Sequence, residues 1–228
     1  MTRRPRIALL NAAHEAADTR RNFRREVPAD LVEFQVIEEE IPAELDVDAF
    51  MVTGSKSSVY WDEPWIRETE TWIRDALDSG LPGMGVCFGH QLLARALGGR
   101  VEDMGEYELG YREISHESDP LFSGIDPTFL AFTTHSDRVT ELPPGAELLA
   151  ENDAGIQGFR HGESVGVQFH PEYDLETARR IAAEKDVPEA QRERVEASIT
   201  EANYRRARQA AIVFENFVAG IESRAASD

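Results

Sequence analysis

Short apolar runs alternate with segments of helical periodicity over the first hundred residues. The apolar runs, which predict strands, cover residues 6–10, 31–37, 49–53 and 81–87. The segments with helical periodicity cover residues 15–25, 64–77 and 89–97. Strands that alternate with helices favour an α/β fold, and we expect a mostly parallel open sheet with helices on both faces.

The segment 64–77 is the clearest amphipathic helix in this half of the chain. Pro64 stands at an early helical position and Gly80 follows the last turn, which are common start and stop signals. Trp65 and Trp72 fall on its apolar face, together with aliphatic residues. This placement favours packing in the core over a role as a ligand platform.

The pattern changes after Arg100. Strand-like pieces, separated by proline and glycine turns, cover residues 109–114, 129–133, 147–150, 156–160 and 165–169. They predict an antiparallel extension of the sheet. Residues 175–224 are rich in Ala, Glu and Arg and predict two or three helices, with a weak point at Val187 and Pro188. We therefore expect one domain over residues 1–228 with a C-terminal helical extension at about 175–224.

The chain is strongly acidic. It has 43 Asp and Glu against 24 Lys and Arg, a formal charge of −19, which disfavours nucleic acid and anionic membranes as partners. Only Lys56 and Lys185 are lysines, and the acidic residues are scattered, so we expect a salt-adapted (halophilic) surface; the alternative is an ordinary acidic cytosolic protein. No apolar run is long enough to span a membrane, and the first residues lack a secretory apolar core. These features predict a cytoplasmic protein.

Cys87 is the only cysteine, so no intrachain disulfide and no cysteine-rich metal site can form. A lone cysteine is often a small buried apolar residue. Here Gly85 and Gly89 flank it at a turn from an apolar strand into a helix, the context of a nucleophile elbow. The start of the helix favours a thiolate over a thiol. The sequence therefore predicts a nucleophilic cysteine.

A thiol nucleophile needs a base, usually a histidine oriented by a carboxylate. His170 follows the apolar run 165–169, and in an extended chain Glu172 projects to the same side. Both would lie at the carboxyl ends of the strands, where open α/β sheets bind ligands. The alternative for His170 is a capping or core histidine.

Two segments carry a family resemblance. Gly85-Val-Cys-Phe-Gly-His-Gln91 and Gln168-Phe-His-Pro-Glu172 resemble the nucleophile and His-x-Glu motifs of class I glutamine amidotransferases. Thr134-His-Ser-Asp-Arg-Val139 is similar to the segment between those motifs in the glutaminase part of GMP synthases. Within the family, residues 7 to 172 most resemble the stand-alone GMP-synthase-like glutamine amidotransferases, a group that includes γ-glutamyl peptidases. The implied fold is class I glutamine amidotransferase-like, related to flavodoxin.

The resemblance implies a Cys-His-Glu triad of Cys87, His170 and Glu172. Cys87 would attack the side-chain amide of glutamine, His170 would protonate the leaving ammonia and then activate water, and Glu172 would orient His170. The γ-glutamyl thioester would be hydrolysed to glutamate. The chain has no P-loop, dinucleotide fingerprint or metal-ligand spacing, so we expect no cofactor and no metal.

The oxyanion hole implied by the resemblance consists of backbone N–H groups of Gly54, Ser55 and Phe88. The segment Thr53-Gly-Ser-Lys-Ser57 departs from the Gly-Gly-Pro that many members have there, so the resemblance implies the flexible position at Gly54 but not the preorganisation of the loop. Lys56 either attracts a carboxylate or is simply solvated. The adjoining residues 57–61 form either a flap over the site or a plain surface loop.

The resemblance also implies that Gln91, Thr134, His135 and Ser136 lie near the α-amino and α-carboxylate groups of glutamine. For His135 a purely structural role is the alternative. The remaining histidines are in polar loop-like contexts or, for His90, in the first turn of a helix.

Three outcomes remain open for the activity. The ammonia would go to a separate synthetase, or the chain would act independently as a γ-glutamyl peptidase or hydrolase, or it would transfer the γ-glutamyl group to another amine. The length after Glu172 favours independent action. The peptidase and chaperone branch of this fold typically places its acid elsewhere, and a catalytically silent regulatory or binding module would not need all three triad residues. The expected partners are thus glutamine or a γ-glutamyl amide, while a separate synthetase and an oligomer are left open.

Overall fold

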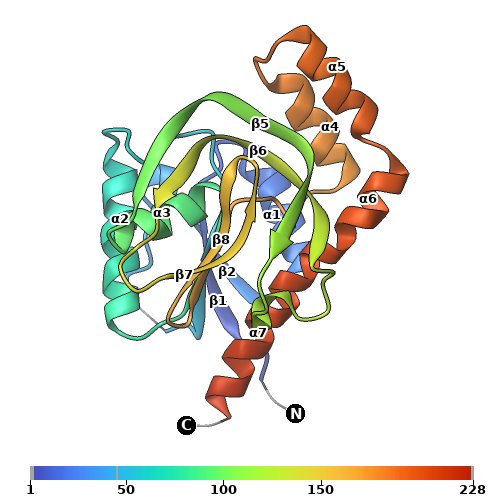
Figure 1. Cartoon of the computed structure of the whole chain (residues 1–228). Coiled ribbons are helices and arrows are strands. Elements are labelled where there is room, and N and C mark those ends of the chain that lie inside the picture. The colour runs from blue at the N-terminus through green and yellow to red at the C-terminus, as the bar shows by residue number, and fades with distance from the viewer. Residues whose placement is uncertain (1–2, 45, 227–228) are drawn as a thin grey trace.

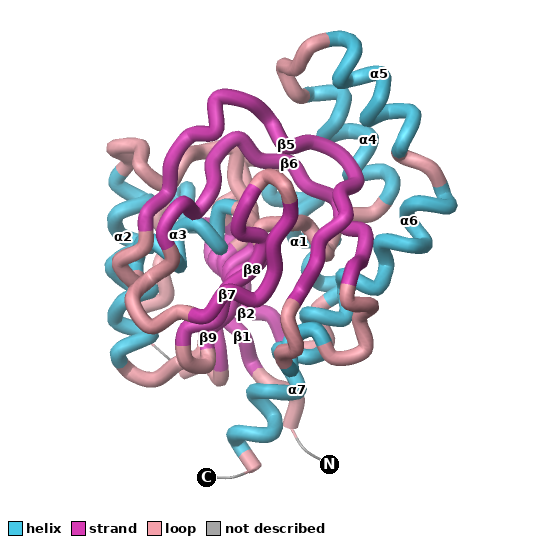
Figure 2. Tube along the Cα trace, viewed as in Figure 1, coloured by secondary structure: helices cyan, strands magenta, loops and turns pink. Residues whose placement is uncertain are grey.

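The computed structural model describes residues 3–44 and 46–226. Within them, nine strands form one sheet in the order β2-β1-β3-β4-β9-β8-β7-β5-β6 (Figures 1 and 2). The parallel half consists of β2 (Asp30–Gln35), β1 (Arg6–Asn11), β3 (Ala49–Val52), β4 (Gly83–Val86) and β9 (Ser164–Val167). The α/β class and the parallel sheet predicted from the sequence are confirmed.

The antiparallel half consists of β8 (Gly155–His161), β7 (Glu147–Asn152), β5 (Arg100–His116) and β6 (Thr128–Glu141). β9, assigned from the sequence to the antiparallel extension, is parallel to β4 and antiparallel to β8, so it joins the two halves. The prediction holds for the pairing with β8 and missed the parallel pairing with β4, because a four-residue run that is buried throughout does not indicate the direction of its partners.

β5 and β6 are also longer than the pieces expected at 109–114 and 129–133. They form a two-stranded ribbon that arches over one end of the sheet (Figures 1 and 2). Their pairing shifts register between Asp103 and Glu108, and the first half of β5 is largely exposed. Exposed strands lack the apolar alternation by which the sequence reveals a strand.

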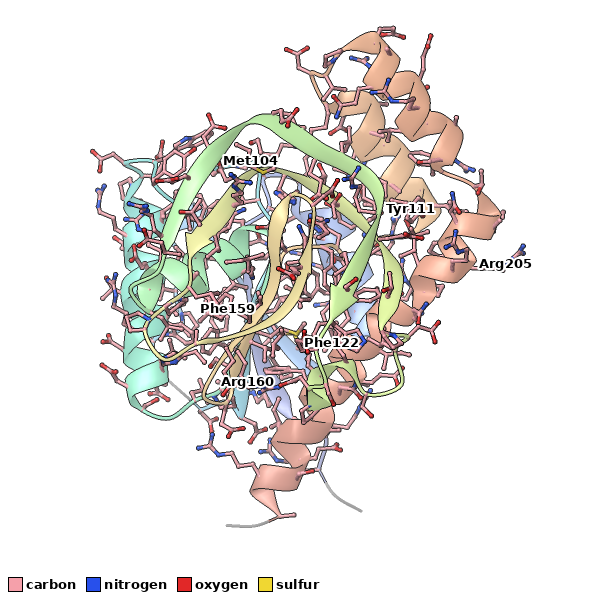
Figure 3. The ribbon with its side chains drawn as sticks, viewed as in Figure 1. Met104, Tyr111, Phe122, Phe159, Arg160 and Arg205 are labelled. Atoms are coloured by element: carbon pink, nitrogen blue, oxygen red, sulfur yellow. The ribbon has the colours of Figure 1, made fainter. Side chains whose placement is uncertain are left out.

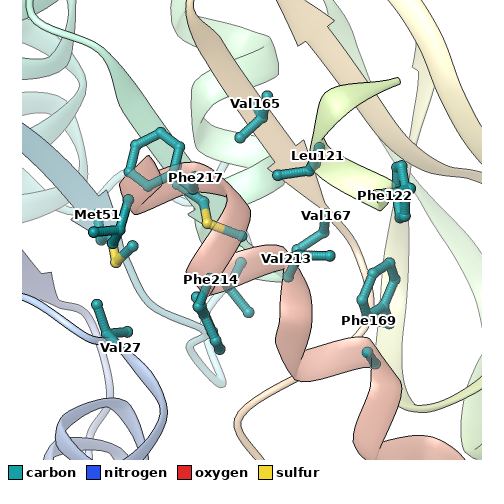
Figure 4. Packing of buried hydrophobic residues seen from close by; sticks show 14 of the residues in the cluster. Val27, Met51, Leu121, Phe122, Val165, Val167, Phe169, Val213, Phe214 and Phe217 are labelled. Carbon is teal, nitrogen blue, oxygen red and sulfur yellow. The ribbon is translucent and has the colours of Figure 1, made fainter. Parts of the chain in front are cut away.

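Helices cover both faces of the parallel half. α1 (Ala16–Glu26) and α7 (Ile212–Ala225) lie on one face, where Phe23 and Phe214 pack with ring centroids 5.7 Å apart. Val213, Phe214 and Phe217 of α7 pack among apolar side chains of the sheet (Figure 4). Burying a phenylalanine of this kind stabilises the fold by about 1.5–3 kcal/mol.

α2 (Pro64–Asp78) and α3 (Phe88–Ala96) cover the opposite face. Phe50 of β3 meets Trp72 of α2 edge to face, at 5.5 Å between centroids. Trp72 also donates its indole N–H to the Pro42 carbonyl at 3.0 Å. The tryptophans of α2 therefore belong to the core, as expected from their position on the helix.

The C-terminal region contains four α-helices where the sequence predicts two or three. In addition to α7 these are α4 (Leu175–Glu184), α5 (Glu189–Ser198) and α6 (Glu201–Ala207). The break before α5 falls at Pro188, close to the predicted weak point. The break before α6 was missed: Thr200 caps α6 by accepting the Asn203 N–H at 3.2 Å.

Apolar side chains fix α4 and α5 against the β5–β6 ribbon. Leu109 and Phe132 of the ribbon share a buried cluster with Ala178 and Ala182 of α4 and Val195 of α5. This contact brings α4 over the carboxyl ends of the parallel strands.

The outer surface of these C-terminal helices is polar. Arg205 of α6 points away from the body of the molecule (Figure 3). Three 3₁₀ turns, at Val36–Glu38, Pro120–Phe122 and Arg208–Ala211, complete the described elements. Among the described residues, no helix is long and apolar enough to cross a membrane.

Candidate active site

The carboxyl ends of four parallel strands meet at one edge of the sheet. The residues that follow β1, β3, β4 and β9 there include Ala13, Gly54, Cys87 and His170. Open parallel sheets bind their ligands at this edge. The strands therefore bring together residues that are more than 150 positions apart in the sequence.

Cys87 occupies a strained turn between β4 and α3. Its φ is 53° and its ψ is −105°, a left-handed conformation that non-glycine residues rarely adopt. The Cys87 N–H donates to the Val167 carbonyl at 2.9 Å. A side chain on Gly85 or Gly89 would overlap neighbouring backbone, so the turn requires both glycines. Backbone strain of this kind costs on the order of 1–3 kcal/mol and is typical of active sites.

His170 and Glu172 form a buried pair. His170 Nδ1 lies 2.8 Å from Glu172 Oε1, and both side chains are at most 3% exposed. The His170 N–H donates to the Phe132 carbonyl of β6 at 2.8 Å, which holds the end of β9 in place. With Nδ1 engaged, Nε2 is the ring atom left for chemistry; it is buried and has no hydrogen-bond partner among the described residues.

Gly54 lies against both Cys87 and His170. A Cβ placed on Gly54 would come within 2.9 Å of His170 Cε1 and 3.6 Å of Cys87 Cβ. The absence of a side chain at this position thus lets the loop after β3 approach both residues. The structure brings Gly54, Cys87, His170 and Glu172 into one site.

The charges in this site favour a protonated His170. Burial by itself lowers the pKa of His170, but the negative charges of Glu172 and Cys87 outweigh it and raise this pKa to about 10. The Tyr173 ring stacks on the imidazole with centroids 4.1 Å apart and planes 20° apart. Burial, followed by the nearby charges of Glu172 and Cys87, raises the pKa of the Tyr173 phenol, which therefore stays neutral.

A cavity of about 60 Å³ opens on His170 and Glu172. Its walls come from α1, the loop after β3, β6 and α4, and they include the residues Ala13, His14, Glu15, Asp18, Thr19, Asn22, Gly54, Ser55, Lys56, Thr134, Tyr173, Thr177, Arg180, Ile181 and Lys185. The contribution of α1 and α4 to the site could not be predicted from the sequence, because their residues lie far from the motifs along the chain.

The three backbone N–H groups predicted to form the oxyanion hole are those of Gly54, Ser55 and Phe88. Phe88 is the first residue of α3, so its N–H has no acceptor within the helix. In the part of the chain that the structure describes, the N–H groups of Gly54 and Ser55 have no acceptor either. Among the described residues, the three predicted donors thus have no backbone acceptor.

The residues expected near the head group of glutamine divide into two groups. Thr134 lines the cavity; its carbonyl oxygen is 3.9 Å from Cys87 Sγ, and its buried hydroxyl has no partner among the described residues. The cavity walls do not include Gln91, His135 or Ser136. The structure therefore supports only Thr134 as a contact of a ligand in this cavity.

Gln91 and His135 are engaged in buried hydrogen bonds elsewhere. Gln91 donates to the Asp137 carbonyl at 2.9 Å and to Gln168 at 3.1 Å. His135 Nε2 lies 2.6 Å from Glu108 Oε2, in agreement with the structural alternative for this residue. A sequence motif does not indicate the orientation of its side chains. Here the side chains of Gln91 and His135 both point into the protein.

The segment 57–61 is an anchored loop. Ser57 is buried and bonds to His14 Nε2 at 2.9 Å, while the Tyr60 hydroxyl donates to Asp137 at 2.8 Å. The rings of Tyr60 and Trp61 are about half exposed. Lys56 is neither free nor simply solvated, because it pairs with two carboxylates.

His90 is fully buried beside Phe159, with ring centroids 5.0 Å apart. Burial lowers its pKa to about 3, so it is a neutral part of the core. The described residues contain no group of three His, Cys, Asp or Glu side chains arranged to hold a metal ion.

Comparison with known proteins identifies the class to which this fold and site belong. The family model "Glutamine amidotransferase class-I" matches residues 16–187, so the chain is a member of the class I glutamine amidotransferase family. Its relatives include a glutamine-hydrolyzing GMP synthase subunit from Methanococcus maripaludis (strain C5), which is 36% identical over 152 residues, or 64% of this chain and 76% of that protein.

The GMP synthase of Thermomicrobium roseum is 38% identical over 130 residues, which are 56% of this chain. The matched region is 24% of that protein, so the chain corresponds to about a quarter of this longer relative. A glutamine amidotransferase structure from Thermotoga maritima superimposes with a TM-score of 0.78 at 21% identity, covering 95% of this chain and 99% of that one. This likeness confirms the class I amidotransferase fold.

Proposed function

We propose that this protein hydrolyses the side-chain amide of glutamine through a γ-glutamyl thioester on Cys87. The observation that carries the proposal is the strained Cys87 turn facing the buried His170–Glu172 pair across Gly54. Nothing in a core-packing role requires a cysteine in a left-handed conformation beside a protonated histidine.

The first half-reaction begins with the Cys87 thiolate and the His170 imidazolium. The sulfur attacks the amide carbon, and the carbonyl π electrons move to the oxygen. The N–H groups of Phe88, Gly54 and Ser55 stabilise this oxyanion. His170 donates its proton to the nitrogen, the C–N bond breaks, and ammonia leaves a thioester and a neutral imidazole.

The second half-reaction restores the enzyme. Neutral His170 takes a proton from water while the water oxygen attacks the thioester carbon. The C–S bond then breaks, which regenerates the Cys87 thiolate beside the His170 imidazolium and leaves glutamate, whose new carboxyl group gives its proton to solvent. Glu172 holds the imidazole through Nδ1 and stabilises its charged form in both steps.

The destination of the ammonia depends on a partner. Similarity to a GMP synthase subunit supports delivery to a separate synthetase, whereas a cavity walled by this chain's own residues supports hydrolysis without one. We propose that glutamine hydrolysis itself proceeds in the isolated chain. A large stimulation on addition of a candidate synthetase would contradict this part of the proposal.

The proposal is tested by ammonia and glutamate release in three proteins. Wild type should turn over glutamine, and Glu172→Gln should lose about 10²–10⁴-fold in kcat, the range typical of general acid–base catalysis. Glu176→Gln is the matched control, because its carboxylate is 81% exposed on α4 and, among the described residues, pairs only with Arg21, at 3.5 Å. Equal activity of the two variants would contradict the role of Glu172.

A further inference from the structure

Tyr173 follows the His170–Glu172 pair directly in the sequence and covers the His170 ring. Its own ring stacks on the imidazole with centroids 4.1 Å apart and planes 20° apart. The Tyr173 side chain also lines the cavity that opens on His170 and Glu172. The proposed triad and oxyanion hole do not include this aromatic ring.

The backbone is anchored on both sides of Tyr173. Before it, the Glu172 carbonyl accepts a hydrogen bond from Arg25 of α1 at 2.6 Å. After it, Asp174 caps α4 by accepting the Thr177 N–H at 2.8 Å, and the same carboxylate accepts a bond from Arg25 at 2.7 Å. Tyr173 is therefore fixed to both α1 and α4.

Phe132 of β6 supports both members of the stacked pair. Its ring lies 5.9 Å from the Tyr173 ring, centroid to centroid. Its carbonyl oxygen accepts the His170 N–H at 2.8 Å. Tyr111 of β5 meets the Phe132 ring edge to face at 5.3 Å, so it belongs to the same aromatic cluster, but it does not line the cavity on His170.

The two contacts of the imidazole constrain different motions. The 2.8 Å hydrogen bond between His170 Nδ1 and Glu172 fixes one edge of the ring but not the tilt of its plane. The nearly parallel Tyr173 ring fixes this tilt. The face of an aromatic ring also attracts a cation within about 6 Å, and the attraction is stronger where water is excluded. His170 is buried, so its charged form gains this attraction without solvent between the rings.

We propose that Tyr173 is a positioning residue for His170: its ring face stabilises the imidazolium and keeps Nε2 directed at Cys87. This inference rests on the proposed function, since it takes His170 as the acid and base of that reaction. It deepens that function by assigning the orientation of the imidazole to two neighbours, Glu172 at its edge and Tyr173 at its face.

The charged groups around His170 come from several elements. Glu172 and Cys87 raise its pKa, and the Tyr173 phenol is neutral. The other titratable groups along the same cavity are His14, Glu15 and Asp18 at the start of α1, Lys56 after β3, and Arg180 and Lys185 at α4. Substitutions at position 173 leave all of them in place, so a difference between the substituted proteins reports on the ring.

The test compares side chains of similar shape at position 173. Tyr173→Phe keeps the aromatic face. Pentafluorophenylalanine incorporated at this position keeps the shape of the ring but reverses the charge distribution of its face. Tyr173→Leu removes the ring. The pKa of His170 is measured by NMR titration of its ring resonances, and kcat and KM for glutamine are measured by ammonia release.

The pKa of His170, about 10 in wild type, should fall by about one unit in Tyr173→Leu and by at least as much with pentafluorophenylalanine. Tyr173→Phe should restore most of the lost shift. In the two proteins with the lower pKa, kcat should fall about tenfold with KM changed less than about threefold, because a misplaced reacting group slows the chemical step. Tyr111→Leu is the control for loss of packing in the aromatic cluster, and it should leave the pKa of His170 unchanged.

Two results would overturn the inference. One is a His170 pKa that is the same with phenylalanine and with pentafluorophenylalanine at position 173. The other is a Tyr111→Leu protein whose His170 pKa shifts as far as in Tyr173→Leu, which would assign the effect to packing alone.

The titration needs no turnover, so it separates this inference from the proposed function. A His170 pKa that follows the ring face in a protein that leaves glutamine intact contradicts only the proposed function. Turnover of glutamine with a His170 pKa that is indifferent to the ring contradicts only the role of Tyr173.

Discussion

Removing the charge of Glu172 should lower the pKa of His170. The Glu172→Gln substitution keeps a hydrogen-bonding side chain beside His170 Nδ1 but removes one of the two negative charges that hold the imidazole protonated. An opposite charge at this range shifts a pKa by about 1–3 units. We therefore expect the pKa of His170 to fall from about 10 by at least one unit.

The same shift predicts how stability depends on pH. Since folding raises the pKa of His170 from 6.5 to about 10, protonation of His170 stabilises the folded state. For a raised pKa this contribution is complete below about pH 6.5 and is lost as the pH rises toward 10. Glu172→Gln should lose part of this stabilisation. The difference in the free energy of unfolding between wild type and Glu172→Gln should therefore become smaller above pH 9.

The assay is an NMR titration of the histidine ring resonances, with His170 assigned from the spectrum of His170→Gln. Glu176→Gln is the control for a general effect of removing a carboxylate, because this side chain is 81% exposed. A wild-type His170 that titrates near pH 6.5, or a midpoint unchanged in Glu172→Gln, would refute the electrostatic reasoning.

Three further predictions test the turn, the loop and the surface. Cys87→Gly should melt at a higher temperature than Cys87→Ala, because glycine relieves a positive φ that costs alanine about 1 kcal/mol or more; equal melting temperatures would argue against strain. Gly54→Ala should lower kcat at least about tenfold with the fold intact by circular dichroism, because its Cβ would lie 2.9 Å from His170 Cε1; full activity would contradict this contact. The melting temperature should rise between 0.1 and 2 M KCl, because salt screens a net charge of −19, and a flat response would contradict salt adaptation.

The first four parallel strands, β1 to β4, and the proposed triad were predictable from the sequence. Buried parallel strands are continuous apolar runs, and the elbow around Cys87 depends on glycines that have a local steric cause. The sequence predicted that His170 and Glu172 lie on one side of an extended chain. The structure has them 2.8 Å apart, but Pro171 and Glu172 form a turn after β9. The apolar strands and the turn around Cys87 depend on residues that are close together in the sequence, so a sequence pattern predicts them.

The rest of the site depends on contacts between distant segments. α4 reaches the cavity because Ala178 packs under the β5–β6 ribbon, and no local pattern indicates that contact. Gln91 turns into the protein because the Asp137 carbonyl and Gln168 accept its hydrogen bonds there. The ion pair of Lys56 with Glu184 joins residues 128 positions apart, so only the fold shows it.

Release of ammonia and glutamate from glutamine by wild type and Cys87→Ala tests the central claim most directly. We expect equal amounts of both products from wild type, a covalent γ-glutamyl adduct on Cys87 in acid-quenched samples, and no release from the variant. Turnover that persists in Cys87→Ala would contradict the claim. So would a wild-type protein that leaves glutamine intact with and without a synthetase, even though its Cys87 reacts with iodoacetamide.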